Sequence, residues 1–219
     1  MKNRQKYNTV LFDLDGTLLD TSFGILKAVD ATIESLGFKK LSLTQKKLMI
    51  GPPIEQSFQK IYCLSKEEAA HAASVFREIY AEKYLMDAIP YPGILDLLRW
   101  MKAEKWKMGI ATYKRNDYAQ TLMMEKEILP LVNIALGARN STETKADIIR
   151  TCLSTLQAEP RTTLMVGDTL HDYIGAVQEG CSFIGVTYGF GFQDEKEIQK
   201  MKNVVWANSV LEIKSFLMS

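Results

Sequence analysis

The chain has 219 residues, of which 47% are hydrophobic and 24% are charged, so it can form a globular protein with a sizeable core. Its 27 Lys and Arg residues balance 26 Asp and Glu, and a net charge of +1 gives no reason to expect a nucleic acid polymer or a membrane as partner. No window approaches the roughly 20 apolar residues of a membrane span, and we expect a cytoplasmic protein. Cys63, Cys152 and Cys181 have no CxxC spacing, and we expect reduced thiols that are buried as small hydrophobes.

Short apolar runs rich in β-branched residues alternate with segments of helical period. The expected strands are 9–12, 107–111, 132–136, 163–166, 182–186 and a weaker 204–206. The expected helices are 94–103, 116–128, 144–156, 173–179 and 209–217. This alternation predicts an α/β fold, a Rossmann-like three-layer core with a parallel sheet between helices.

The long stretch between the first two expected strands shows almost no strand signal. Apolar residues recur at helical spacing in 22–36, 54–62 and 66–85, and breaks at Gly37 and at Gly51-Pro52-Pro53 separate these segments. We therefore expect a small all-α domain at residues 21–89, inserted into a discontinuous core formed by residues 1–20 and 90–219. Aromatic residues at helical spacing in the insert are expected to pack in its interior: Phe58, Tyr62, Phe76 and Tyr80.

Two acids follow the first expected strand, in Asp13-Leu14-Asp15-Gly16-Thr17. In extended chain, alternate side chains share a side, so Asp13 and Asp15 are expected to face the same space. Two carboxylates this close favour a cation beside them, although Asp-Gly turns are also common without any chemistry. The pattern indicates a metal site.

Further polar residues follow the later strands: Thr112, Lys145, and Gly167-Asp168-Thr169 with Asp172 close behind. Ligands of open parallel sheets bind beyond the carboxyl ends of the strands, so these residues should converge with the two acids. Each has a structural alternative: Thr112 as a helix N-cap, Asp172 as a first-turn charge, and Lys145 as a solvated lysine. Together they supply ligands for a cation, donors for a phosphate and a carboxylate that can attack phosphorus, which indicates phosphoryl transfer.

In this order, the motifs resemble those of the haloacid dehalogenase superfamily. Ile50-Gly51-Pro52-Pro53-Ile54 and Tyr91-Pro92-Gly93 are similar to its phosphoglycolate phosphatase-like branch, whose members carry a helical cap after the first motif. The resemblance implies a phosphoric monoester hydrolase: a Mg²⁺-dependent phosphatase that acts through a phospho-aspartate. Its substrate would be a small phosphorylated metabolite such as phosphoglycolate, a nucleotide, a sugar phosphate or pyrophosphate.

The resemblance also implies a role for each motif residue. Asp13 would attack phosphorus, and Asp15 would serve as acid and base. Mg²⁺ would be held by Asp13, by the backbone carbonyl of Asp15 and by Asp168, with Asp172 steadying the metal site or Lys145. The catalytic residues Thr112 and Lys145 would bind the phosphoryl oxygens.

The expected substrate contacts extend to five more residues: Gly16, Thr17, Tyr113, Gly51 and Pro52. Tyr113 stands where the family often has Asn, which leaves the contacts after Thr112 open. The Gly51-Pro52 turn is expected to reach the active site, or else to be only a break between helices. The glycine-rich segment 185–191 lacks a dinucleotide fingerprint, and we expect a flexible loop near the cap.

Two alternatives to a phosphatase remain. A sugar-phosphate mutase of the same superfamily would return the phosphoryl group to the substrate before water arrives. A non-enzymatic receiver domain also gathers acids, a Thr and a Lys around Mg²⁺, but the helical insert and Asp15 argue against it. The chain is expected to be a monomer or a homodimer.

Overall fold

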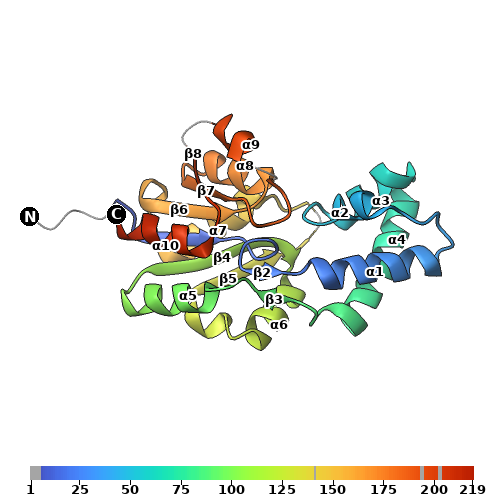
Figure 1. The fold of residues 1–219 in the computed structure, drawn as a ribbon, viewed down its shortest axis with the longest axis horizontal. Helices are drawn as coiled ribbons and strands as arrows, with labels where there is room; N and C mark the ends of the chain where they lie inside the picture. The colour runs from blue at the N-terminus through green and yellow to red at the C-terminus, as the bar shows by residue number, and fades with distance from the viewer. Residues whose placement is uncertain (1–5, 141, 193–194, 202–203) are drawn as a thin grey trace, which may run out of the picture. The chain divides into compact units, whose positions relative to one another are not determined.

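The computed structural model describes residues 6–140, 142–192, 195–201 and 204–219. Within them the chain forms a six-stranded parallel sheet in the order β5-β4-β1-β6-β7-β8 (Figure 1). The strands are β1 (Thr9–Phe12), β4 (Lys107–Arg115), β5 (Ile134–Ala138), β6 (Thr163–Gly167), β7 (Ser182–Val186) and β8 (Val204–Ala207). The predicted α/β fold class is confirmed.

Helices cover both faces of this sheet. The core helices are α5 (Ile94–Ala103), α6 (Asn116–Glu125), α7 (Lys145–Leu156), α8 (Leu170–Gln178), α9 (Glu195–Gln199) and α10 (Val210–Met218). Right-handed crossovers place α7, α8 and α9 on one face and α5 and α6 on the other. On the α7 side, Leu11, Met165 and Ile149 belong to one fully buried apolar cluster. This packing holds the start of α7 against the strand ends.

The central strand explains where the polar residues come together. All residues of β1, with the sequence TVLF, are buried, as expected for a strand that is covered on both faces. Phe12, the last residue of β1, pairs with Ile110 of β4 and with Val166 of β6, so the residues that come next in the three segments lie at nearly the same level, although β4 itself continues through Arg115. These residues therefore lie together on the side of the sheet where the carboxyl ends of the strands are found.

Several elements differ from their predicted bounds. Strand β4 continues through Arg115, with a register shift between Ala111 and Arg115, instead of ending at residue 111. Strand β5 starts two residues later than predicted, because Leu129–Leu131 forms a 3₁₀ turn that contains Pro130. Helix α8 starts at Leu170 instead of 173, because Thr169 and Asp172 form a capping box at its first turn.

The chain divides into two compact units, residues 20–89 and the remainder. The unit of residues 20–89 contains α1 (Ser22–Ser35), α2 (Leu43–Lys47), α3 (Ile54–Tyr62), α4 (Lys66–Ile79) and a π-helical turn at Tyr80–Tyr84. Its expected packing aromatics lie inside: Phe58, Phe76 and Tyr80 are buried, and the half-buried Tyr62 stacks on Phe58. Short strands β2 (Leu19–Asp20) and β3 (Ile89–Pro90) pair where the chain passes between the units.

The cysteine prediction is wrong at one position. Cys152 and Cys181 are buried, as expected, but Cys63 is exposed. It ends α3 in the left-handed region, at φ 55°, so it belongs to a turn at the surface. Within the described residues, no helix combines the length and the apolar character that crossing a bilayer requires.

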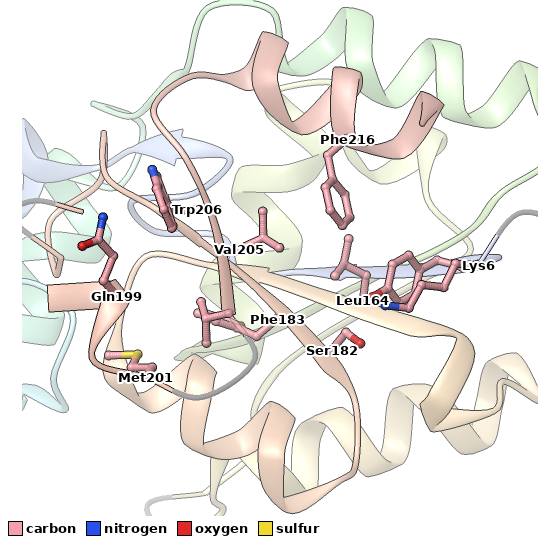
Figure 2. A pocket seen from close by; sticks show the side chains of 11 residues that line it. Lys6, Leu164, Ser182, Phe183, Gln199, Met201, Val205, Trp206 and Phe216 are labelled. Atoms are coloured by element: carbon pink, nitrogen blue, oxygen red, sulfur yellow. The ribbon is translucent and has the colours of Figure 1, made fainter. Parts of the chain in front are cut away.

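A cavity of about 610 Å³ opens beside the amino ends of the later strands (Figure 2). It is lined by Leu164 of β6, Ser182 and Phe183 of β7, residues of β8 and Phe216 of α10. Leu164 and Ser182 stand at or near the start of their strands, whereas the predicted functional residues follow the strand ends. The cavity is therefore separate from the predicted site.

Candidate active site

Three buried acids meet beyond the carboxyl ends of β1 and β6. Asp13 follows β1, Asp168 follows β6, and Asp172 lies in the first turn of α8. One carboxylate oxygen from each lies within 4.8 Å of the other two. Asp13 is 6% exposed and the other two are fully buried. The acids that the sequence placed on two separate segments thus form one cluster that could hold a metal ion.

Lys145 supplies the positive charge of this cluster. It is the first residue of α7 and is 3% exposed. Its Nζ lies 2.8 Å from Asp13 Oδ1 and 2.7 Å from Asp172 Oδ1, and it donates to the Ala111 carbonyl oxygen at 2.9 Å. Lys145 is therefore an interior lysine, and the alternative of a solvated surface lysine is wrong.

The glycine at 175 in α8 makes room for this lysine. A Cβ on Gly175 would lie 2.8 Å from Lys145 Cγ, closer than a side chain tolerates. The aliphatic stem of Lys145 therefore runs along a helix face where only glycine fits.

Burial shifts the titration of the clustered groups. The pKa of Asp13 is raised to about 7: burial is the largest cause, Lys145 opposes it, and the charges of Asp172 and Asp15 add to it. Burial also raises the pKa of Asp168 well above its ordinary value, and Asp172 and Asp13 add to this. For Lys145, burial alone would lower the pKa, but the adjacent carboxylates outweigh it and hold the pKa above its usual value. A divalent cation beside these acids would offset the cost of their ionisation.

Asp168 is held by a glycine-rich segment after β7. Its Oδ2 accepts hydrogen bonds from the backbone N–H groups of Phe190, at 2.8 Å, and Gly191, at 3.2 Å. A Cβ on Gly189 would lie 2.5 Å from the Asp168 Cβ, so the chain can approach Asp168 this closely only because residue 189 has no side chain. The expected loop at 185–191 starts two residues later than predicted, because Gly185 and Val186 lie in β7. Phe190 and Gly191 bind an acid of the site, and the flexibility of the loop stays a prediction.

Gly16 and Thr17 approach Asp168 from the first motif. The Thr17 hydroxyl donates to Asp168 Oδ1 at 3.3 Å. Gly16 adopts φ 81°, and a Cβ there would lie 2.2 Å from Asp168 Oδ2. Both residues thus shape the surroundings of Asp168, and their contacts with a substrate remain a prediction.

Asp15 is not one of the three clustered acids, although its charge contributes to the raised pKa of Asp13, and the expectation that the two side chains face the same space stays a prediction. The chain leaves the strand after Phe12 and turns at Gly16, and the Asp15 carboxylate accepts from Lys114 Nζ at 3.1 and 3.4 Å. Both of these side chains are largely buried, at 15% and 7% exposed. Sequence reasoning missed Lys114, because its spacing from Thr112 carries no recognisable signal.

Thr112 and Tyr113 occupy the end region of β4. Thr112 is 1% exposed, and its hydroxyl accepts from the N–H of Lys114 at 3.2 Å, which leaves its own O–H free to donate to a ligand. It is not a helix N-cap, because α6 begins only at Asn116. The Tyr113 hydroxyl accepts from the N–H of Lys145 at 2.9 Å.

The remaining predicted residues lie in the unit of residues 20–89. Gly51 adopts φ 101° and precedes Pro52 and Pro53, after which α3 begins. This geometry agrees with a tight turn between helices. The expected substrate contacts of Gly51 and Pro52 stay predictions.

The chain is similar to known hydrolases over most of its length. The family model for haloacid dehalogenase-like hydrolases matches residues 10–186. A 5'-nucleotidase of Pseudomonas aeruginosa is 32% identical over 192 residues, which cover 87% of each chain. Phosphoglycolate phosphatase 1 of the same organism is 26% identical, over 83% of this chain and 70% of that protein.

Solved structures agree with this. A haloacid dehalogenase-like hydrolase from Streptococcus pneumoniae superposes with a TM-score of 0.88 at 31% identity, covering 96% of this chain and 98% of that one. A protein described as a predicted phosphatase from Clostridium acetobutylicum gives 0.89 at 30% identity, with 97% and 99% coverage. The chain belongs to the haloacid dehalogenase-like hydrolase family. Within that family it is a phosphatase.

Proposed function

We propose that this phosphatase is Mg²⁺-dependent and hydrolyses a small phosphorylated metabolite through a phospho-aspartate on Asp13. The observation that carries the proposal is the buried contact of Asp13 Oδ1 with Lys145 Nζ at 2.8 Å, inside a cluster with Asp168 and Asp172. A carboxylate beside a fixed ammonium can meet an anionic phosphate without prohibitive repulsion.

The acids of the cluster fit a magnesium ion. Mg²⁺ prefers hard oxygen donors, and Asp13, Asp168 and the backbone carbonyl of Asp15 would supply them. Asp168 is already oriented by three hydrogen bonds, from Thr17, Phe190 and Gly191. When bound, the ion would offset the negative charge of the carboxylates and of the phosphoryl group. Both Asp172 oxygens contact Thr169 or Lys145, so its role would be to hold Lys145.

The residues of the chain divide the reaction into two displacements. An oxygen of Asp13 attacks phosphorus and forms an acyl phosphate while the ester P–O bond breaks, and Asp15 donates a proton to the leaving oxygen. Asp15 then accepts a proton from the water that attacks phosphorus, which releases phosphate and restores the Asp13 carboxylate. Lys145 and Thr112 donate to the phosphoryl oxygens throughout.

Residues 21–89 would serve as the cap of this enzyme. A cap that closes over a phosphate site excludes water and contacts the leaving group, so it would select the substrate. The Gly51-Pro52 turn would contribute some of these contacts. The names of the relatives favour a nucleoside monophosphate and phosphoglycolate as the first compounds to test, followed by sugar phosphates and pyrophosphate.

The test is a phosphate-release assay on the purified protein with p-nitrophenyl phosphate and then with a panel of phosphorylated metabolites. We expect turnover with MgCl₂, loss of turnover with EDTA and recovery when Mg²⁺ is restored. Activity that is indifferent to chelation would refute the metal assignment. A stable phosphoprotein without turnover would favour a receiver domain, and isomerised sugar phosphate from glucose 1-phosphate would favour a mutase.

A further inference from the structure

Tyr113 follows Thr112, which is one of the proposed phosphate-binding residues. It lies in β4, is half-buried and packs against the apolar cluster under α7. Its hydroxyl oxygen accepts the backbone N–H of Lys145 at 2.9 Å. A residue of β4 is thus hydrogen-bonded to Lys145, the first residue of α7.

This bond completes the start of α7. The first N–H groups of a helix have no partner inside the helix. Thr144 caps α7 by accepting from the N–H of Asp147, and the Asp147 carboxylate accepts from the N–H of Thr144 in return. Tyr113 takes the N–H of Lys145, which this capping box leaves unpaired. The main chain from which the Lys145 side chain projects is therefore fixed from outside the helix.

The aromatic ring of Tyr113 also lies near the lysine charge. Lys145 Nζ is 5.3 Å from the ring centroid, within the range of a cation–π contact. The ring meets His171 edge-on, with centroids 5.5 Å apart and planes at 76°. The glycine at 175 borders the Lys145 stem as well, so two elements, β4 and α8, bound the space available to this side chain.

We propose that Tyr113 is a positioning residue that places the Lys145 ammonium between Asp13 and Asp172. The hydroxyl fixes the backbone of Lys145, and the ring faces its charge. Tyr113 then acts through the lysine and not by direct contact with the substrate. The inference rests on the proposed role of Lys145 in binding the phosphoryl group.

The kinetic test compares Tyr113→Phe, which loses only the hydroxyl, with Tyr113→Leu, which loses the ring as well. Loss of one hydrogen bond should lower kcat about 3- to 10-fold. Loss of both contacts allows the lysine to move, and displacement of a catalytic group by about 1 Å can cost on the order of 100-fold. KM should change less than kcat. The matched control is Tyr7→Phe. Tyr7 precedes β1 and lines the cavity at the amino ends of the strands, away from the site, so this variant should keep the wild-type activity.

A spectroscopic measurement separates this inference from the proposed function. The backbone amide proton of Lys145, observed by ¹H–¹⁵N NMR, should move upfield in Tyr113→Phe and stay in place in Tyr7→Phe, because the phenol oxygen accepts that proton. If the wild-type protein hydrolyses no phosphate ester but the amide shifts, the function fails and the Tyr113–Lys145 coupling stands. If the enzyme is active and neither the amide nor kcat responds to Tyr113→Phe, the positioning role is refuted.

Discussion

Replacement of Lys145 by alanine tests whether the buried ion pairs hold the site together. Lys145 Nζ lies 2.8 Å from Asp13 and 2.7 Å from Asp172, and all three side chains are at most 9% exposed. Removing one partner of a buried pair leaves an uncompensated charge, which costs about 3–5 kcal/mol of unfolding free energy. We expect a loss of this size in metal-free protein at about pH 8, where Asp13 of the wild-type protein, with its pKa raised to about 7, is ionised and paired with Lys145.

The control variant is Arg150→Ala, on the same helix. Arg150 also contacts two acids, Asp147 at 2.8 Å and Glu179 at 2.6 Å, but its side chain is 61% exposed. Solvent screens such pairs, so this variant should lose far less stability than Lys145→Ala. The two variants remove ion pairs of similar N–O distance, and they differ mainly in how deeply the removed side chain is buried.

Urea denaturation followed by tryptophan fluorescence measures the effect. The three tryptophans, Trp100, Trp106 and Trp206, all lie in the unit that contains the site, so the signal reports its unfolding. Saturating MgCl₂ should restore part of the lost stability, because a cation replaces the missing charge. If Lys145→Ala and Arg150→Ala shift the midpoint equally, the argument from burial is wrong.

Three further predictions address the nucleophile, the metal and the glycine-rich segment. Asp13→Asn should abolish phosphate release while circular dichroism stays unchanged, and substantial activity in the folded variant would exclude Asp13 as nucleophile. Since burial raises the pKa of Asp13 to about 7, a proton competes with Mg²⁺ below that pH, and calorimetric Mg²⁺ affinity should fall by up to about tenfold per pH unit from about pH 7 to 5. Mg²⁺ affinity that does not change with pH would contradict the raised pKa of Asp13. The raised pKa also affects the stability of the metal-free protein: the Asp13 carboxyl stabilises the fold most below pH 3.8, its ordinary pKa, and this contribution is lost as the pH rises through about 7. Gly189→Ala should weaken Mg²⁺ binding, because its Cβ would lie 2.5 Å from Asp168 Cβ, whereas Gly180→Ala, which meets only Pro160 at 3.7 Å, should strain its own turn and leave Mg²⁺ affinity intact.

The sequence by itself determined the class of the fold and the family. Strands that are buried on both faces need continuous apolar runs, so TVLF at residues 9–12 and the later runs were visible as strands without any tertiary information. The motif around Asp13 and the segment Gly167-Asp168-Thr169 identified the family, and the family model confirms it. The assignment of residues 21–89 as a cap stays a prediction that the helices of that unit agree with.

Only the tertiary structure decided how the polar groups are shared within the site. Alternation along an extended strand predicted that Asp13 and Asp15 face one space, but the contact of the Asp15 carboxylate with Lys114 left no signal in the sequence. No local pattern shows that Lys145 is buried or that the segment after β7 binds Asp168, because these contacts join residues that are far apart in the sequence. Local periodicity records which face of an element is apolar, whereas hydrogen bonds and charge pairs between distant segments exist only once the sheet has brought the strand ends together.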